Sequence, residues 1–218
     1  MGNVHNDKQT ALKVASDLLQ IEAIKLNIEN PFTWSSGWKS PIYCDNRLSL
    51  SYPDTRTFIK EALADAAKSH FQGYEAVAGV ATAGIPQGAL LAEALGVPFI
   101  YVRSKPKGHG MENLIEGKVT PGQKVIIVED LISTGGSSLK AADALQKCGF
   151  EVLGMLAIFT YGFPLADANF KKANIELHCL SNYQIMLEKA IELGYIDTSD
   201  LASLEEWRND PANWGVIR

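Results

Sequence analysis

The sequence predicts an α/β protein whose core is a parallel sheet with helices on both faces. Strand-like apolar segments alternate with helical segments through the middle of the chain, and this order is typical of parallel sheets with right-handed crossovers. Residues 125–128 are four consecutive β-branched residues, as expected of a strand buried on both faces. The 218 residues, 46% hydrophobic and 21% charged, suit a single globular domain with a sizeable core.

The first elements are a helix, an irregular segment and a second helix. Residues 8–28 are expected to be helical because apolar residues recur there at three- and four-residue spacing, at Leu12, Ala15, Leu18, Leu19 and Ala23. Residues 30–47 combine Pro, Gly and Ser with three large aromatic residues, which predicts an ordered, strand-poor segment. A helix over residues 55–69 follows, with Asp54 as its N-cap.

The remaining elements alternate. Strands are expected at residues 76–81, 97–103, 125–128, 151–161 and 175–180. Helices are expected at residues 87–95, from 139 to Gly149, at 183–193 and at 199–209, with a loop and short helix at 163–173. Residues 82–86 read as a turn, and residues 104–117 as a polar loop that is long for a compact domain.

The strand at 125–128 runs into a segment suited to a sugar phosphate. Its two carboxylates, Glu129 and Asp130, precede a turn of hydroxyls and glycines that opens a helix; the turn is Leu131, Ile132, Ser133, Thr134, Gly135, Gly136 and Ser137. Such a turn presents backbone N–H groups to an anion, and the helix dipole favours negative charge. The acids would repel a bare phosphate, but they can hold a divalent metal or accept hydrogen bonds from sugar hydroxyls. An isolated Glu-Asp pair would more often only cap a strand.

A basic loop is expected at the same edge of the sheet, because it follows the carboxyl end of the strand expected at residues 97–103. Ligands of open α/β sheets bind at this edge. Its four potential cations are Arg103, Lys105, Lys107 and His109. A solvated loop is the commoner explanation of such a run. In an otherwise acidic protein, cations beside a phosphate site suggest stabilisation of a departing anion. The turn after residue 81 could add backbone N–H groups.

Composition excludes several other classes. The net charge of −5 argues against a dedicated nucleic-acid binder. The N-terminus lacks the apolar core of a signal peptide, and no apolar run reaches membrane-spanning length. Three widely spaced cysteines without a Cys-x-x-Cys pair favour a reducing cytoplasm and no zinc site. Neither nucleic acid nor membrane is therefore expected as a partner.

Residues 125–137 resemble the phosphoribosyl-pyrophosphate (PRPP) signature of type I phosphoribosyltransferases. Residues 32–47 and 101–110 resemble the corresponding segments of the orotate phosphoribosyltransferases, and the similarity extends over about residues 26–161. The resemblance implies the type I phosphoribosyltransferase fold in one domain of residues 1–218. It would comprise a small hood (about 1–50), an α/β core (about 55–180) and C-terminal helices (about 183–218), and we expect Trp207 and Trp214 to pack against the hood.

The same resemblance implies a pentosyl transfer, in which orotate and PRPP give orotidine 5′-monophosphate and pyrophosphate in pyrimidine (UMP) biosynthesis. Mg²⁺ would be bound mainly through the pyrophosphate, with no protein side chain as a metal ligand. The protein would be a homodimer in which loop 103–117 of one subunit covers the site of the other.

The resemblance also assigns roles to residues. Glu129 and Asp130 would bind the ribose hydroxyls, and residues 131–137 the 5′-phosphate. Arg103, Lys107 and His109 would bind the pyrophosphate and act as the catalytic residues. The orotate-binding candidates are Ser133, Lys39 and Arg47.

The sequence departs from one pattern of that family at positions where basic residues are usual, namely Ser35, Ala83, Ser104 and Thr160–Tyr161. These departures leave open which groups bind the carboxylate of orotate. Two other functions remain compatible with the sequence: a PRPP-binding regulator with the same fold, and a phosphoribosyltransferase for another base.

Overall fold

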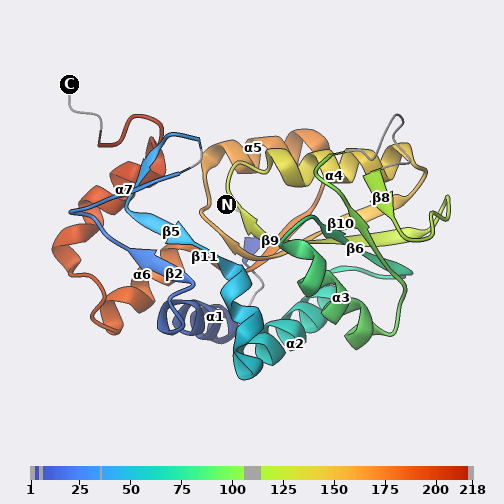
Figure 1. The fold of residues 1–218 in the computed structure, drawn as a ribbon, viewed down its shortest axis with the longest axis horizontal. Helices are drawn as coiled ribbons and strands as arrows, with labels where there is room; N and C mark the ends of the chain where they lie inside the picture. The colour runs from blue at the N-terminus through green and yellow to red at the C-terminus, as the bar shows by residue number, and fades with distance from the viewer. Residues whose placement is uncertain (1–2, 5–6, 35, 106–113, 216–218) are drawn as a thin grey trace.

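The computed structural model describes residues 3–4, 7–34, 36–105 and 114–215. Its centre is a seven-stranded sheet in the order β1-β11-β10-β9-β6-β7-β8 (Figure 1). The strands are β1 (Asn3–Val4), β6 (Ala76–Val80), β7 (Phe99–Val102), β8 (Ile115–Glu116), β9 (Lys124–Ile132), β10 (Glu151–Thr160) and β11 (Leu177–Asn182). All neighbouring pairs are parallel except β7 and β8, which are antiparallel.

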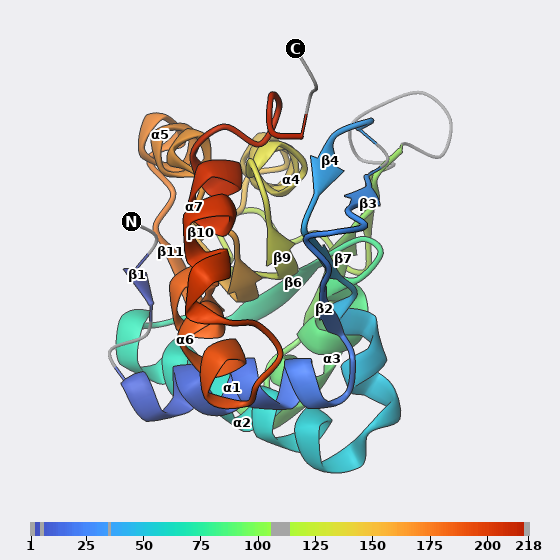
Figure 2. The same ribbon diagram turned by 90° about the vertical axis from the view of Figure 1, so that its left-hand side faces the viewer.

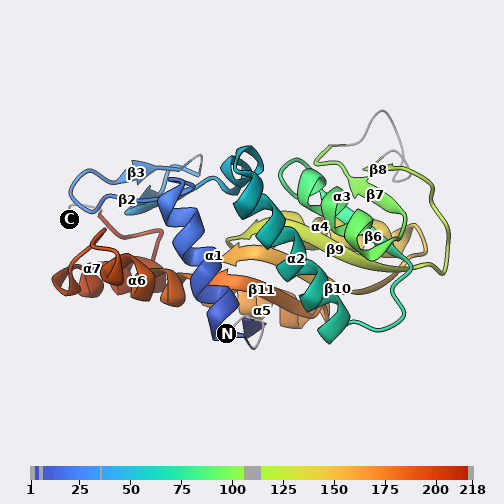
Figure 3. The ribbon, with the colours of Figure 1, turned by 90° about the horizontal axis from the view of Figure 1, so that it is seen from below.

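Helices cover both faces of this sheet, which confirms the predicted fold class. The helices are α1 (Lys8–Gln20), α2 (Pro53–His70), α3 (Gly84–Leu95), α4 (Gly136–Lys147), α5 (Pro164–Ala173), α6 (Tyr183–Glu192) and α7 (Leu201–Asn209). Figure 3 shows α1, α2 and α3 across one face, while α4 and α5 lie on the other. Among the described residues, no helix has both the length and the apolar character needed to cross a bilayer.

The central strand β9 is buried on both faces, as its β-branched run predicts. Ile126 and Val128 belong to the apolar cluster beneath α1 to α3, and Val125 and Ile127 to the cluster beneath α4 and α5. All four side chains have no exposed surface. Because successive side chains of a strand point to opposite faces, this one segment anchors both layers of the core.

Two small antiparallel sheets lie at one end of the molecule. β2 (Ile24–Leu26) pairs with β5 (Ile42–Cys44), and β3 (Phe32–Thr33) pairs with β4 (Lys39–Ser40). They share this end with α6 and α7 (Figure 2). Trp207 of α7 makes an edge-to-face contact with Trp34 at 5.6 Å between ring centroids, and Trp214 packs against the same cluster. The packing predicted for Trp207 against the hood is thus present, whereas the contact predicted for Trp214 with the hood stays a prediction.

Several predicted boundaries were wrong. The first helix ends at Gln20 rather than at residue 28, because Glu22 adopts a left-handed φ of 56° and the chain then enters β2. The second helix begins at Pro53 with Tyr52 as its N-cap, so Asp54 lies in the first turn; proline favours that first position because its N–H would be unpaired anyway. Likewise α3 begins at Gly84, inside the predicted turn.

The two edge strands were missed. The expected strand-poor segment contains the short strands β3, β4 and β5, and the polar loop contributes β8 to the sheet. β1 and β8 have two residues each, which is too short for an alternation of apolar and polar residues to be recognised.

Candidate active site

The turn after β9 joins a strand to the N-terminus of a helix, an arrangement that favours anions. β9 extends to Ile132, and α4 follows from Gly136 with Gly135 as its N-cap at a φ of 77°. A Cβ on Gly135 would lie 2.6 Å from Cε2 of Phe170, so both conformation and space require glycine here. The turn therefore leads its backbone N–H groups directly into the N-terminus of a helix, where an anion is favoured.

A polar pocket of about 250 Å³ lies over this turn. Two segments line it: Ala81, Thr82 and Ala83 after β6, and Glu129, Asp130, Leu131, Ser133, Thr134, Gly135, Gly136, Ser137 and Ser138 after β9. The two loops meet because Gly84 packs against β9, where a Cβ would lie 2.5 Å from the carbonyl oxygen of Val128. The structure thus brings together two of the three loops expected at this edge of the sheet.

Of the two acids at the pocket, Glu129 is buried and its neighbour Asp130 is half-buried. Oε1 of Glu129 accepts a hydrogen bond from the backbone N–H of Asp130 at 3.0 Å, and Oε2 accepts one from Oγ of Ser138 at 3.0 Å. Burial and the adjacent charge of Asp130 raise the pKa of Glu129 to about 9. Burial also raises the pKa of Asp130. Before a sugar phosphate binds, the pair therefore carries less negative charge than two solvated carboxylates would, which lessens the repulsion of a phosphate.

A larger cavity of about 610 Å³ adjoins the polar pocket. Leu131, Ser133 and Thr134 line both, and the remaining walls come from Thr33, Trp34, Ser36, Trp38, Tyr43, Cys44 and Tyr161. The rings of Trp34 and Tyr161 are in contact at 5.1 Å between centroids. Nε1 of Trp34 donates a hydrogen bond to the carbonyl of Ile42 at 3.0 Å, which fixes the indole. Aromatic walls with a few polar groups suit a flat, polar ring.

Asn46 joins the small N-terminal sheets to the acids. It is 1% exposed, and its Nδ2 donates a hydrogen bond to the backbone carbonyl of Asp130 at 2.7 Å. Sequence reasoning missed Asn46 and the aromatic walls. The three aromatic residues within residues 30–47 were a usable signal for the walls, but nothing local in the sequence pointed to Asn46, and Tyr161 was noted only as lying where the family usually has a basic residue.

Comparison with known proteins identifies the family. Residues 54–177 match the family model described as "Phosphoribosyl transferase domain". The chain is 58% identical over 202 residues to the orotate phosphoribosyltransferase of Cytophaga hutchinsonii, which covers 93% of this chain and 97% of that relative. The chain belongs to the orotate phosphoribosyltransferase family. The resemblance seen in residues 125–137 is thereby confirmed.

Two further members of the orotate phosphoribosyltransferase family extend this finding. The relative from Enterococcus faecalis is 52% identical over 207 residues, which are 95% of this chain and 99% of the relative. The crystal structure of orotate phosphoribosyltransferase from Aeropyrum pernix superposes with a TM-score of 0.73 at 30% identity, covering 84% of this chain and 99% of that one. The type I phosphoribosyltransferase fold is confirmed.

Of the three cations that the family resemblance assigns to the pyrophosphate, the structure describes only Arg103. Nη1 of Arg103 forms an ion pair with Oε1 of Glu116 at 2.9 Å. Lys107 and His109 lie outside the described residues. Nζ of Lys39 donates a hydrogen bond to Oγ1 of Thr33 at 2.9 Å.

Arg47 holds the carboxylate of Asp45 through contacts of 2.6 and 2.8 Å. Neither Lys39 nor Arg47 is among the residues that line the two cavities, so their assignment to orotate stays a prediction.

Glu129 should make the stability of the protein depend on pH when no substrate is added. Its pKa rises from an ordinary value of 4.5 to about 9 on folding, so the protonated form stabilises the fold. That contribution is complete below about pH 4.5 and is lost as the pH rises through about 9. As the pH is raised from about 4.5 to about 9, we expect the urea midpoint of the wild type to decrease relative to that of Glu129→Gln, with unfolding measured by circular dichroism. The exposed-site control Glu151→Gln should follow the wild type, and a midpoint difference independent of pH would contradict the titration of Glu129.

Proposed function

We propose that this chain transfers the phosphoribosyl group of PRPP to orotate, giving orotidine 5′-monophosphate and pyrophosphate in UMP biosynthesis. The observation that carries the proposal is the pair of adjoining cavities. One is polar and lies at a helix N-terminus beside two acids, and the other has aromatic walls; Leu131, Ser133 and Thr134 belong to both. A sugar phosphate in the first would lie next to a planar base in the second. The names carried by the close relatives support the same reaction.

The polar pocket supplies a complementary group for each part of the sugar phosphate. The N–H groups and hydroxyls of residues 131–137 would bind the 5′-phosphate. Glu129 and Asp130 would accept hydrogen bonds from the ribose hydroxyls. Donation from these hydroxyls favours the charged carboxylates, so sugar binding should release the proton that burial keeps on Glu129 before the sugar binds.

The aromatic cavity would hold orotate. Trp34, Trp38 and Tyr43 offer faces and edges for a flat ring, and Ser133 lies at the boundary with the sugar site. Of the two cations proposed for the orotate carboxylate, Lys39 is the freer. Among the described residues its Nζ donates to the neutral hydroxyl of Thr33, which lines this cavity, whereas Arg47 is engaged by a carboxylate.

Charge stabilisation and positioning would carry the reaction. Breaking the bond from ribose C1 to pyrophosphate develops positive charge on the sugar and negative charge on the leaving group. Orotate N1 attacks C1 once the base is held beside it, so binding both substrates provides much of the rate enhancement. Arg103, Lys107 and His109 would stabilise the departing pyrophosphate.

Mg²⁺ fits the donor set of the polar pocket. The carboxylates of Glu129 and Asp130 and the hydroxyls of the turn are oxygen ligands, which this ion prefers. The ion would be held mainly by pyrophosphate oxygens and, when bound, would neutralise part of the leaving group's charge.

A cytoplasmic homodimer is part of the proposal, with loop 103–117 of one subunit covering the site of the other. The base of that loop is fixed within its own subunit. The backbone N–H of Arg103, directly after β7, donates to the carbonyl of Leu114, directly before β8, at 2.7 Å, and Arg103 also forms an ion pair with Glu116 of β8.

A direct assay tests the proposed reaction. The purified protein is mixed with PRPP, Mg²⁺ and one base at a time (orotate, uracil or hypoxanthine), and pyrophosphate release is measured. We expect release with orotate alone. Turnover with uracil or hypoxanthine instead would make the protein a phosphoribosyltransferase for another base. Absence of turnover with every base, together with measurable PRPP binding, would favour a regulator that kept the fold and lost the chemistry.

A further inference from the structure

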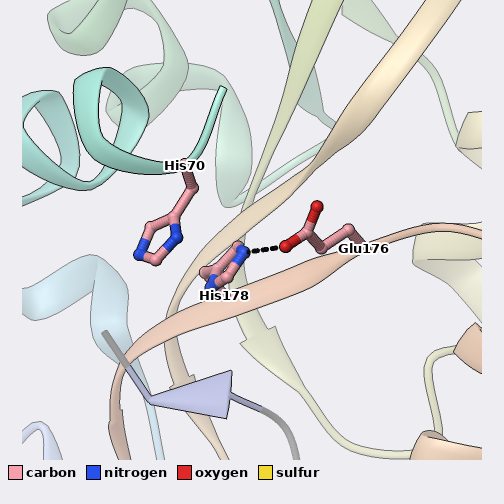
Figure 4. Close-up of side chains that lie close together, drawn as sticks. All are labelled: His70, Glu176 and His178. Carbon is pink, nitrogen blue, oxygen red and sulfur yellow. Dashed lines mark hydrogen bonds and ion pairs between the residues drawn. The ribbon is translucent and has the colours of Figure 1, made fainter. Parts of the chain in front are cut away.

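We infer that His70, Glu176 and His178 bind one divalent transition-metal ion, such as Zn²⁺, at a site separate from the active site. His70 is the last residue of α2, Glu176 immediately precedes β11, and His178 is the second residue of that strand. One possible ligand atom from each residue lies within 4.8 Å of those of the other two. Figure 4 shows the two imidazole rings and the carboxylate converging between the end of the helix and the start of the strand.

The chain geometry explains why the three side chains meet. Glu176 and His178 are two residues apart on an extended segment and therefore point to the same side. Nε2 of His178 and Oε1 of Glu176 are 2.7 Å apart. The C-terminal end of α2 covers that side of β11, and the ring of His70 stacks on the ring of His178 with 3.6 Å between centroids and 17° between planes. Phe71 contacts His178 edge-on at 5.7 Å.

His178 has a buried ring nitrogen without a hydrogen-bond partner in the described part of the chain. The side chain is 4% exposed, and its Nδ1 has no hydrogen-bond partner among the described residues. If Nε2–H donates to Glu176, Nδ1 keeps a free lone pair in the interior. Buried polar atoms are normally satisfied, and an exception calls for an explanation such as an ion. A metal ion would bind one ring nitrogen and rearrange the hydrogen bonding of the other.

The ligand set selects the class of ion. Two imidazoles and one carboxylate are a typical set for Zn²⁺, which completes a tetrahedron with water. Mg²⁺ and Ca²⁺ prefer oxygen ligands alone, so they should bind poorly here. The C-terminal end of α2 adds a favourable field, because the partial negative charge of a helix C-terminus attracts cations.

Binding requires the ligands to close on the ion and His70 to turn out of its stack on His178, because the lone pairs of an imidazole lie in the plane of its ring. With zinc–ligand bonds of about 2.0–2.2 Å, the ligand atoms of a tetrahedral zinc site lie roughly 3.3 Å apart. In this structure the three possible ligand atoms are separated by up to 4.8 Å. Glu176 is exposed and His70 is half-buried at a helix end, so both can rotate toward the buried His178. The bound ion would join the end of α2 to the start of β11. Its effect would therefore be on stability, because the active-site pocket lies beyond the opposite, carboxyl ends of β6 and β9.

The proposed site differs from two sequence expectations, that the protein has no zinc site and that no side chain is a metal ligand. The cysteines are not involved. His70 and His178 are far apart in the sequence, and only the packing of α2 on β11 brings them together.

Zinc titration of the metal-free, full-length protein tests the inference. We expect calorimetry to show one Zn²⁺ per chain. Loss of a partner beside a metal ligand typically costs about 10–100-fold in affinity, so His70→Ala and Glu176→Gln should each weaken zinc binding at least about tenfold. The control Glu151→Gln removes an exposed carboxylate elsewhere and should bind zinc like the wild type. A wild type that binds no zinc, or two site variants with wild-type affinity, would overturn the inference.

Two further measurements separate this site from loss of folding and from the active site. Zinc should raise the Tm of the wild type but not that of the double variant, which combines His70→Ala with Glu176→Gln. The reason is that only a ligand that binds the folded state stabilises it. The double variant should keep wild-type turnover without zinc, which shows that it folds. Zinc binding that survives in the double variant but disappears in Asp130→Ala would place the ion at the active-site acids and refute the proposed ligands.

Discussion

Replacing Lys107 by alanine should lower kcat by a factor on the order of 10²–10³, the usual cost of removing one preorganised charge contact to a transition state. Lys107 is proposed to neutralise the pyrophosphate as it leaves, so the loss should be in kcat while PRPP still binds. Steady-state kinetics with orotate, together with a titration of PRPP binding, measures both quantities. The residue lies outside the described part of the chain, but its loop begins and ends on strands joined by the ion pair of Arg103 with Glu116.

The matched control for this variant is Lys105→Ala. Lys105 has the same charge, belongs to the same loop and is exposed, yet no contact to the pyrophosphate is proposed for it. Its removal should change kcat little, which would separate a specific contact from the general positive field of the loop. Near-normal turnover of Lys107→Ala would show that leaving-group stabilisation comes from other groups.

Mixing two inactive variants extends the test to the dimer. Lys107→Ala lacks the loop cation and Asp130→Ala lacks a ribose ligand, so each homodimer should be nearly inactive. If the loop of one subunit serves the site of the other, a mixed dimer contains one site with neither substitution, and partial activity should return. Unchanged inactivity after subunit exchange, verified by mass spectrometry, would argue that each subunit completes its own site.

The parts of the site that could be predicted are those encoded by consecutive residues. β9, its acids and its glycine turn form an uninterrupted segment, so their order alone predicts a strand, an anion site and a helix. The meeting of the turn after β6 with that segment was also predictable, because parallel strands end at a common edge. Burial of the acids was not predictable from local sequence. It depends on their contacts with distant parts of the chain, such as the hydrogen bond from Asn46 to the carbonyl of Asp130.

The aromatic cavity illustrates the same limit. Trp34 and Tyr161 are far apart in sequence and meet only because the small N-terminal sheets fold over the end of β10. Periodicity describes how a segment pairs with its neighbours, and it carries no information on which remote segment covers it. The edge strand β8 was not predicted for a related reason. A two-residue strand is defined by its pairing with a neighbour, here β7, and that pairing cannot be read from the local sequence.

A second large effect, on stability, is expected when Trp207 is replaced. This residue packs against the aromatic side chains at the end of the molecule that contains the aromatic cavity. Its side chain has no exposed surface. The rings of Trp34, Tyr161, Phe163 and Tyr183 surround it at 5.4–5.6 Å between centroids. Replacing a buried tryptophan by alanine typically costs about 3–5 kcal/mol, so Trp207→Ala should lose this much free energy of unfolding in urea denaturation. The KM for orotate should rise as well, because Trp34 and Tyr161 line the cavity proposed for it.

Two comparisons distinguish ring packing from other causes of this loss. Trp207→Phe should recover much of the stability, because it keeps an aromatic ring and removes a buried indole N–H that has no hydrogen-bond partner among the described residues. Tyr195→Ala removes a ring that is 49% exposed and should change the free energy of unfolding by no more than about 0.5 kcal/mol. If Trp207→Ala were as stable as Tyr195→Ala, α7 would not hold the cavity in place. A raised KM for orotate in Trp207→Ala but not in Trp207→Phe would instead tie the shape of the base site to this cluster of rings.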